Sequence, residues 1–236
     1  MIAYESSFAD AIRVLHKWDA WEQTPHSIRE WLLAGNAQTE NVGAAEYESF
    51  GARFFGLVFK DSTIYPAVRS RAKALGYDCI MLSEYMEAEA REAGRVNASI
   101  ALTAQRLGEP FKAPVVLMTS GENLVTVGAE KGVGGRNQEY CVAAALRIAG
   151  NDGIVFGAVD TDGTDGPGGL SLPGAPDCLA GAIVDGTTAL DAAESGIDLW
   201  EALKTHGTSE PLWKLGCGVE AEHSVSALDL GIILLM

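Results

Sequence analysis

Two spacings of apolar residues follow one another along the chain. Residues 7–20 carry apolar side chains at the intervals of an amphipathic helix whose inward positions are Phe8, Ile12, Leu15 and Trp18. Thr24 followed by Pro25 is typical of an N-cap and a first helical position, and predicts a second helix. Beyond residue 50 the apolar residues gather in short runs of strand length, which indicates a different architecture.

Short apolar runs alternate with helical segments over the rest of the chain. Strands are expected at 54–59, 78–82, 114–119, 124–128, 153–160 and 230–235. Helices are expected over 62–75, 86–106, 137–149, 187–195 and 199–205. This alternation predicts an α/β fold, with three α/β/α layers around a largely parallel or mixed sheet. The polar, proline-bearing segment EPFKAP, near Gly108–Ala113, predicts a domain boundary between residues 1–110 and 111–236.

The charge balance excludes several classes of partner. The 236 residues include 17 Lys and Arg against 32 Asp and Glu, a formal net charge of −15. Such a field repels polyanions, so we expect no nucleic-acid partner and no membrane partner. No apolar run approaches the roughly 20 residues of a membrane span, and the first residues lack the pattern of a secretory signal. The four cysteines lie far apart without zinc-type spacing, which favours a reduced, cytoplasmic protein.

The first candidate site is a glycine-rich loop at 132–139 that opens an expected helix. Gly134 and Gly135 allow the backbone to approach a ligand, and the helix start presents amide groups with positive partial charge. Arg136 adds a fork of donors that suits a phosphate or a carboxylate, and Asn137 and Gln138 can bond hydroxyl groups. The segment is neither a Walker loop nor a dinucleotide fingerprint. The alternative is a tight turn whose arginine pairs with a surface acid.

The second candidate site is an acidic loop at 160–167. Asp160, Asp162 and Asp165 crowd a strand end, which is costly unless they hold a cation or another specific partner. The spacing excludes an EF-hand, but Mg²⁺ often takes one or two carboxylates with phosphate oxygens, so Asp160 and Asp162 are the candidate metal ligands. The alternative is a solvated acidic turn. We expect the two loops to lie side by side at one edge of the sheet, whereas the four histidines show no spacing typical of a metal site or a catalytic relay.

The order of these loops resembles that of a known family. The segments SGENLVTV, KGVGGRNQEYCVAAAL, DTDGTDGP and AGAIVDGTT resemble the C-terminal MOFRL domain of glycerate 2-kinases, which are often named hydroxypyruvate reductases. Upstream, ADAIRVLHKWDAWEQTPHSIREWL and ALGYDCIMLSEYMEAEAREAG resemble the middle region of the family. The resemblance identifies residues 1–110 as a remnant of the N-terminal and middle region and residues 111–236 as the MOFRL-like domain.

The chain also departs from the family pattern. The N-terminal half of the family, with its nucleotide loop, has no counterpart here. Gly168–Pro176 interrupts the step from TDGP to AGAIVDG, and Ser120–Leu124 stands where the family has Gly-Gly-Glu-Thr-Thr. In the loop Glu220–Asp229 only the final Asp229 matches. These departures leave two hypotheses: a kinase that is incomplete or inactive as an isolated chain, or a non-catalytic small-anion-binding or assembly module.

The resemblance implies a reaction and roles for several residues. A working member of the family transfers the γ-phosphoryl group of ATP, with Mg²⁺, to the 2-hydroxyl of glycerate. Carried over to this sequence, Arg136 would hold the substrate carboxylate or the transferring phosphoryl group, within a binding set that includes Gly134, Gly135, Asn137 and Gln138. Asp162 and Asp165 would face the metal or the attacking hydroxyl, while Glu122 and Glu139 would orient their neighbours. True hydroxypyruvate reduction is a third hypothesis, for which the sequence has no dinucleotide fingerprint.

The missing half also implies a partner. Without it, apolar surface around Phe54, Phe55 and the helices between Trp18 and Trp31 needs a cover. We therefore expect either a homo-oligomer or a separate subunit that supplies the N-terminal half, with a glycerate-like hydroxy acid as the small-molecule substrate.

Overall fold

The computed structural model describes residues 6–52, 54, 64–130, 132–225 and 228–236. The chain divides into two compact units, Met1–Val58 and Phe59–Met236, which are described separately. The first unit contains the helices α1 (Phe8–Lys17), α2 (His26–Ala34) and α3 (Ala44–Ser49). A capping box starts α1, because the Ser7 hydroxyl accepts the Asp10 amide and the Asp10 carboxylate accepts the Ser7 amide.

The described helices of the first unit bury little. Leu32 is their one buried residue, and Phe8 meets Trp31 edge to face at 4.7 Å between ring centroids. Trp18 caps the end of α1 and is 71% exposed, so its predicted inward position is wrong. The second helix begins one residue later than predicted, because Pro25 is the N-cap and the Thr24 hydroxyl donates instead to the Ala20 carbonyl.

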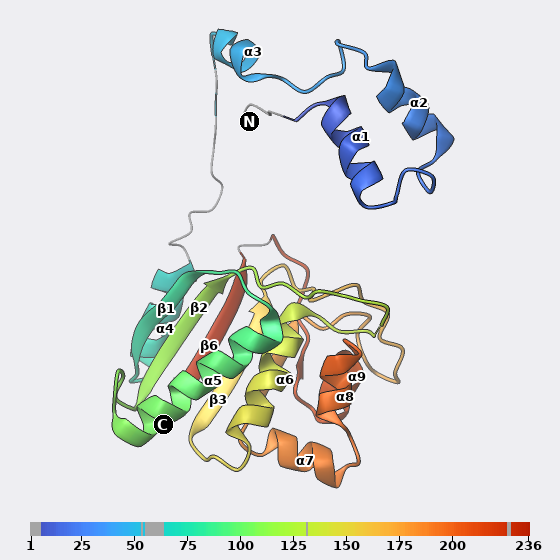
Figure 1. The fold of residues 1–236 in the computed structure, drawn as a ribbon. Coiled ribbons are helices and arrows are strands. Elements are labelled where there is room, and N and C mark those ends of the chain that lie inside the picture. Colours follow the sequence, from blue (N-terminus) through green and yellow to red (C-terminus); the bar gives the residue numbers. More distant parts are fainter. Residues whose placement is uncertain (1–5, 53, 55–63, 131, 226–227) are drawn as a thin grey trace. The chain divides into compact units, whose positions relative to one another are not determined.

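The second unit is built on a mixed six-stranded sheet (Figure 1). Its strands are β1 (Asp78–Met86), β2 (Val115–Gly121), β3 (Ile154–Asp160), β4 (Gly181–Asp185), β5 (Gly218–Val219) and β6 (Asp229–Leu235). The spatial order is β1-β2-β6-β3-β4-β5; β1 and β2 run parallel, and every other neighbouring pair is antiparallel. The mixed form of the predicted sheet is confirmed. The largely parallel form is wrong, because β6 runs antiparallel between β2 and β3.

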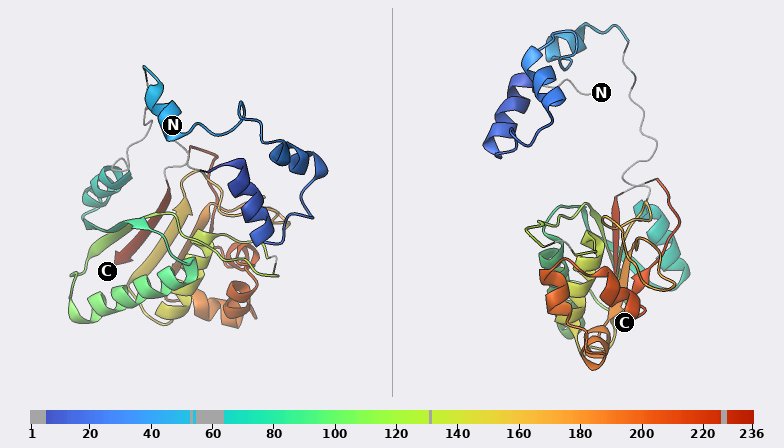
Figure 2. Two further views of the ribbon diagram at one scale, coloured as in Figure 1. Left: turned by 45° about the horizontal axis from the view of Figure 1, so that its top comes forward. Right: turned by 90° about the vertical axis from the view of Figure 1, so that its right-hand side faces the viewer.

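Helices lie on both faces of this sheet, which confirms the three-layer arrangement. The helices are α4 (Ile64–Ala74), α5 (Ala90–Leu107), α6 (Arg136–Ile148), α7 (Thr188–Glu194), α8 (Leu199–Lys204) and α9 (Ser209–Lys214). Figures 1 and 2 show α5 and α6 on one face and α4 on the other. Strand β2 explains why both faces are covered: Val115 and Leu117 point into the core with α5 and α6, whereas Val116 and Met118 point toward α4.

Small side chains let α5 and α6 pack closely. Five buried alanines of α5 face this core, namely Ala90, Ala93, Ala98, Ala101 and Ala104. At Gly94 the backbones come so close that a Cβ atom would lie 2.2 Å from the Tyr140 carbonyl oxygen, so only glycine fits. The Asn97 side-chain amide donates to the Tyr140 hydroxyl at 2.9 Å and satisfies that buried group. This contact fixes α6, and therefore its first residue Arg136, over the sheet.

Two predicted strands and the predicted domain boundary have different outcomes. The strand predicted at 124–128 is wrong: Leu124 makes one isolated bridge to Glu89, and the segment then runs over the surface without further pairing among the described residues. The strand predicted at 54–59 falls almost wholly outside the described residues. The predicted boundary between 1–110 and 111–236 divides family regions rather than the two compact units and stays a prediction. Among the described helices, none combines the length and apolar character of a membrane span.

Candidate functional site

The register of the sheet brings three chain segments together at one end. Asp229, the first residue of β6, pairs with Gly121 at the end of β2 and with Asp160 at the end of β3. The residues that follow β2, including Glu122, therefore lie beside the acidic loop that follows β3. The N-terminus of α6 meets the same end of the sheet, since Arg136 contacts both Asp160 and Asp229. The expectation that the two loops lie side by side is confirmed, at the end of central strands rather than at a lateral edge.

Arg136 is the centre of an ion-pair network, defined here as Arg136, Glu122, Asp160 and Asp229. Its Nε lies 2.9 and 2.8 Å from the two carboxylate oxygens of Asp229, and its Nη2 lies 2.5 Å from Asp160 Oδ2. Glu122 Oε1 lies farther from Nη2, at 3.6 Å. Asp160 and Asp229 are buried, so the short contacts of Arg136 are with interior acids, and the exposed acid Glu122 is only its more distant partner.

The network sets the charge states of its members. Burial lowers the pKa of Arg136, but the hydrogen bonds and charge of Asp229 and the charges of Asp160 and Glu122 outweigh it, so the net pKa is raised. Burial raises the pKa of Asp160, and the Asp162 amide and the Arg136 charge only partly oppose that rise. Arg136 is therefore a permanent cation that compensates carboxylates which would otherwise be costly to bury.

Asp165 caps helix α6. Its Oδ1 accepts the Asn137 amide at 3.1 Å and its Oδ2 accepts the Gln138 amide at 2.9 Å. The Asn137 side chain bridges Asp165 and Asp229, donating to an oxygen of each at 3.2 and 2.9 Å. The expectation that the start of α6 offers free amides at these two positions is wrong, because a carboxylate of the chain itself already occupies them. Asp165 is 1% exposed, so these contacts describe a structural cap, and its predicted role at the substrate stays a prediction.

The glycines of the first loop are required by chain packing. A Cβ atom on Gly135 would lie 2.2 Å from the Asp165 carbonyl oxygen, and one on Gly134 would lie 2.5 Å from the His206 carbonyl oxygen. Both residues line a cavity as well, so ligand contact through their backbones stays a prediction. Gln138 is fully buried, donates to the Asp165 carbonyl oxygen and accepts the hydroxyls of Thr208 and Ser209. Its side chain therefore ties the loops together and does not line either of the two cavities described below.

Arg136 lines a cavity of about 570 Å³, called here the Arg136 cavity. This volume is in the range of small-molecule sites. Its lining combines apolar side chains, those of Leu124, Val125, Val127 and Val133, with the polar side chains of Glu122, Arg136, Glu139 and His206. A largely apolar lining with a few polar groups is typical of a ligand site.

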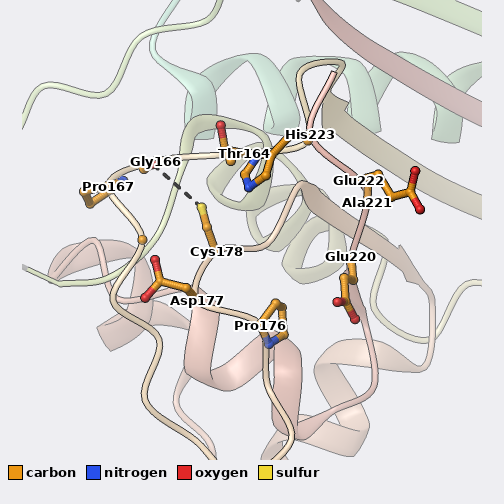
Figure 3. Close-up of a pocket in the computed structure, with 12 residues that line it drawn as sticks. Thr164, Gly166, Pro167, Pro176, Asp177, Cys178, Glu220, Ala221, Glu222 and His223 are labelled. Atoms are coloured by element: carbon orange, nitrogen blue, oxygen red, sulfur yellow. Dashed lines mark hydrogen bonds between the residues drawn. The ribbon is translucent and has the colours of Figure 1, made fainter. Parts of the chain in front are cut away.

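A larger cavity of about 730 Å³, called here the Cys178 cavity, opens beside the acidic loop (Figure 3). Figure 3 shows Asp177 and Cys178 on one side and Glu220 to Glu222 on the other, with His223 near Thr164. The Cys178 thiol donates weakly to the Gly166 carbonyl at 3.7 Å. The walls of the Cys178 cavity include parts of Gly168–Pro176 and Glu220–Asp229, the two segments that depart from the family pattern. We place the candidate site in the smaller cavity, because Arg136 lines that one.

The predicted metal ligands have few carboxylate oxygens free to bind a metal. Asp160 Oδ2 accepts a hydrogen bond from Arg136, and Asp160 Oδ1 accepts one from the Asp162 amide. Asp162 Oδ1 accepts hydrogen bonds from the Thr164 amide and hydroxyl, and these bonds lower the pKa of Asp162. Within the described residues no cluster of three or more His, Cys, Asp or Glu side chains is arranged to hold a metal ion. The donor set therefore fits a magnesium ion that arrives with phosphate oxygens and takes one carboxylate, not an ion held by protein ligands alone.

The buried cap predicts a pH dependence of stability. Burial raises the pKa of Asp165 to about 6, although the amides of Asn137 and Gln138 oppose the rise. Because this folded pKa exceeds the unfolded value, the folded state binds more protons between about pH 4 and pH 6, and stability falls as the pH rises through that range. We expect the stability of wild type relative to Asp165→Asn to fall by about 2–3 kcal/mol between about pH 4 and pH 7. Urea unfolding at both pH values measures it.

The control for this pH dependence is Asp152→Asn, which removes an exposed carboxylate from the same unit. Its stability difference from wild type should change little over the same pH range. A difference between wild type and Asp165→Asn that also stays constant would contradict the assignment of Asp165 as the buried titrating group.

Two residues of the site were not predicted from the sequence. Asp229 holds Arg136 through both carboxylate oxygens and also accepts the Asn123 amide at 3.2 Å. The available signal was that Asp229 alone matches the family pattern in its loop. His206 binds Glu139, with Nδ1 2.8 Å from Oε1. No local spacing could reveal this pair, because α7 and α8 separate the two residues along the chain.

Comparisons with known proteins show what the chain is similar to. Residues 115–226 match the model of the MOFRL family. The chain is 35% identical over 215 residues to glycerate 2-kinase of Pyrococcus horikoshii and 32% identical over 211 residues to D-glycerate 2-kinase of Thermotoga maritima. Each alignment covers 89% of this chain and 45% of the relative. A crystal structure of glycerate kinase from Thermotoga maritima, 30% identical, superposes with a TM-score of 0.74 over 98% of this chain and 51% of that chain.

The chain thus spans about half the length of the relatives it matches. The matched residues include both candidate loops, and the solved relative shares the fold on which these loops are placed. Residues 115–226 therefore belong to the MOFRL family, and most of the chain is similar to about half of each of these glycerate 2-kinases.

Proposed function

We propose that this chain provides the hydroxy-acid-binding part of a glycerate 2-kinase, which transfers the γ-phosphoryl group of ATP to the 2-hydroxyl of glycerate. The observation that carries the proposal is the fixed orientation of Arg136 at the cavity wall. Asp229 and Asp160 hold Nε and Nη2, while Nη1 makes no hydrogen bond within the described residues. A guanidinium with a locked orientation and one open nitrogen suits a carboxylate or a phosphoryl group.

The charges of the network limit the affinity. One cation, Arg136, stands beside the carboxylates of Asp160, Asp229 and Glu122. The local excess of negative charge disfavours a free anion, so we expect a dissociation constant for glycerate of about 1 mM, or weaker. The same excess favours the magnesium ion that accompanies ATP. Asp162 would be its protein ligand through the oxygen not bonded to Thr164, and the ion would neutralise phosphate charge.

A partner that completes the site belongs to this proposal. The first unit exposes apolar and aromatic side chains, among them Trp18, Trp31 and Phe54, the last 95% exposed. Exposed apolar groups of this kind favour a covering surface. We propose either a second copy of the chain or a separate subunit that contains the N-terminal half of the family. A cytoplasmic location is in keeping with the four free cysteines.

The alternative function is a non-catalytic binding module. The segments that depart from the family pattern, Gly168–Pro176 and Glu220–Leu228, contribute walls to the Cys178 cavity beside the acidic loop. Their altered chemistry favours a protein that retains the fold and the Arg136 cavity without phosphoryl transfer. Such a module would bind a small anion at Arg136 or serve in assembly, whereas the kinase function requires that a hydroxy acid binds there.

The test is calorimetric titration of glycerate into wild type, Arg136→Lys and Arg147→Ala. Lysine retains a cation near Asp160 and Asp229 but loses the open nitrogen of the guanidinium, so we expect affinity to fall about tenfold or more. Arg147 is exposed on the same helix and is the matched control, which should bind like wild type. Unchanged affinity in Arg136→Lys, or no binding by wild type at concentrations of about 10 mM, would overturn the proposal.

A further inference from the structure

A second polar pair, Glu139 and His206, lines the Arg136 cavity. His206 Nδ1 lies 2.8 Å from Glu139 Oε1, and the two side chains are 13% and 2% exposed. The other ring nitrogen, Nε2, makes no hydrogen bond to any described residue. His206 thus lines the same cavity as Arg136, and Nε2 is the ring nitrogen that its contact with Glu139 leaves for a ligand.

The backbone holds His206 firmly at this position. The Gly132 amide donates to the Thr205 carbonyl and the Ser209 amide donates to the Val133 carbonyl, both at 3.0 Å. These two bonds join the segment of His206 to the glycine loop that leads into Arg136. His206 itself has a φ of +57°, a conformation that is uncommon for residues other than glycine. Such strain persists only where surrounding contacts impose it, and it clusters at functional sites.

The surroundings favour one tautomer of the ring. The carboxylate beside Nδ1 accepts a hydrogen bond from that nitrogen when Nδ1 carries the proton. In this tautomer the lone pair is on Nε2. Burial raises the pKa of Glu139, and the hydrogen bond and charge of His206, together with the charge of Arg91, oppose that rise. Glu89 also faces this pair electrostatically and adds negative charge. Glu139 is thus a costly buried acid whose contact orients His206.

We propose that His206 Nε2 accepts the hydrogen bond of the ligand's 2-hydroxyl and takes its proton in phosphoryl transfer, with Glu139 as the positioning residue. The inference rests on the proposed function. As the hydroxyl oxygen bonds to the γ-phosphorus of the nucleoside triphosphate, the hydroxyl proton moves to Nε2. The bond from phosphorus to the bridging oxygen breaks, and the nucleoside diphosphate leaves with the electron pair. Glu139 stabilises the His206 imidazolium until the imidazolium returns the proton to water.

The test uses two ligands that separate the hydroxyl groups of glycerate. Lactate retains only the 2-hydroxyl, and 3-hydroxypropanoate retains only the 3-hydroxyl. The variant is His206→Asn, because asparagine tolerates a positive φ and cannot reach the position of Nε2. We expect His206→Asn to weaken lactate binding about threefold to tenfold and to leave 3-hydroxypropanoate binding unchanged. His223→Asn, a histidine that lines the Cys178 cavity, is the control.

The difference between the two ligands is a readout that a purely structural role of His206 would not produce, because a general loosening of the cavity would weaken both ligands alike. Equal losses for both ligands, or a loss for 3-hydroxypropanoate alone, would overturn the inference. Binding that depends on Arg136 but not on His206 would refute this inference and leave the proposed function standing, whereas no binding by wild type would refute both.

Discussion

Residues 1–236, purified alone, are expected to release no ADP above background when supplied with glycerate and Mg-ATP. The described residues hold the Arg136 cavity but show no cluster that could bind a metal ion unaided, and the sequence contains no Walker loop. Placing two substrates correctly contributes roughly 7–11 kcal/mol to catalysis. Residues 1–236 span about half the length of the relatives, so they should supply only part of this placement and turn over about 10⁵-fold more slowly, or slower still.

A coupled ADP-release assay measures this rate. The full-length D-glycerate 2-kinase of Thermotoga maritima is the positive control, since it is 32% identical to this chain over 211 residues. A separately produced N-terminal half of that relative, added to this chain, tests whether a second subunit restores turnover. Robust turnover by residues 1–236 alone, on the order of 1 per second, would contradict the prediction.

Replacing Arg136 by alanine is expected to destabilise the second unit by about 3–5 kcal/mol near neutral pH. The change leaves the buried carboxylates of Asp160 and Asp229 without their shared cation. Burial already raises the pKa of Asp160, and loss of the Arg136 charge removes an interaction that opposes this rise, so acid should relieve part of the loss toward about pH 4. Urea unfolding followed by far-ultraviolet circular dichroism measures both effects.

Two controls make the Arg136→Ala result specific. Arg147→Ala removes an exposed arginine from the same helix and should cost no more than about 0.5 kcal/mol. The triple variant Arg136→Met with Asp160→Asn and Asp229→Asn removes the cation together with both carboxylates and should recover most of the lost stability. A loss below about 1 kcal/mol in Arg136→Ala would show that the network does not depend on its cation.

The sequence predicted the strands and helices with strong periodicity, and it failed where tertiary pairing decides. The apolar run at 124–128 has the composition of a strand, yet among the described residues its strand pairing is limited to the bridge at Leu124, because β6 and β1 already occupy the two sides of β2. Strands buried on both faces read as continuous apolar runs, so their sequence does not reveal direction. The antiparallel insertion of β6 could not be read from LGIILL.

The candidate site was predicted as two loops but not as a network. Glycines and an arginine at a helix start indicated an open anion site, and the structure instead places Asp165 on those amides and Asp229 on the guanidinium. Both carboxylates come from distant positions in the chain, so only the folded sheet brings them there. His206 is likewise distant in the chain from its partner: Glu139 lies in α6, whereas His206 follows α8, so only the fold brings them together.

The position of β6 has a consequence for the order in which the sheet can form. Strand β6 comes after β3, β4 and β5 in the sequence, yet it lies between β2 and β3. Until β6 is synthesised and inserted, β2 and β3 each expose a row of unpaired backbone groups in the middle of the future sheet. Such late, non-local pairing slows folding and exposes the nascent chain to association with other strands. A slip of one residue would turn Asp229 away from Arg136 and exchange the two faces of β6. The ion pair therefore also favours the correct register of β6.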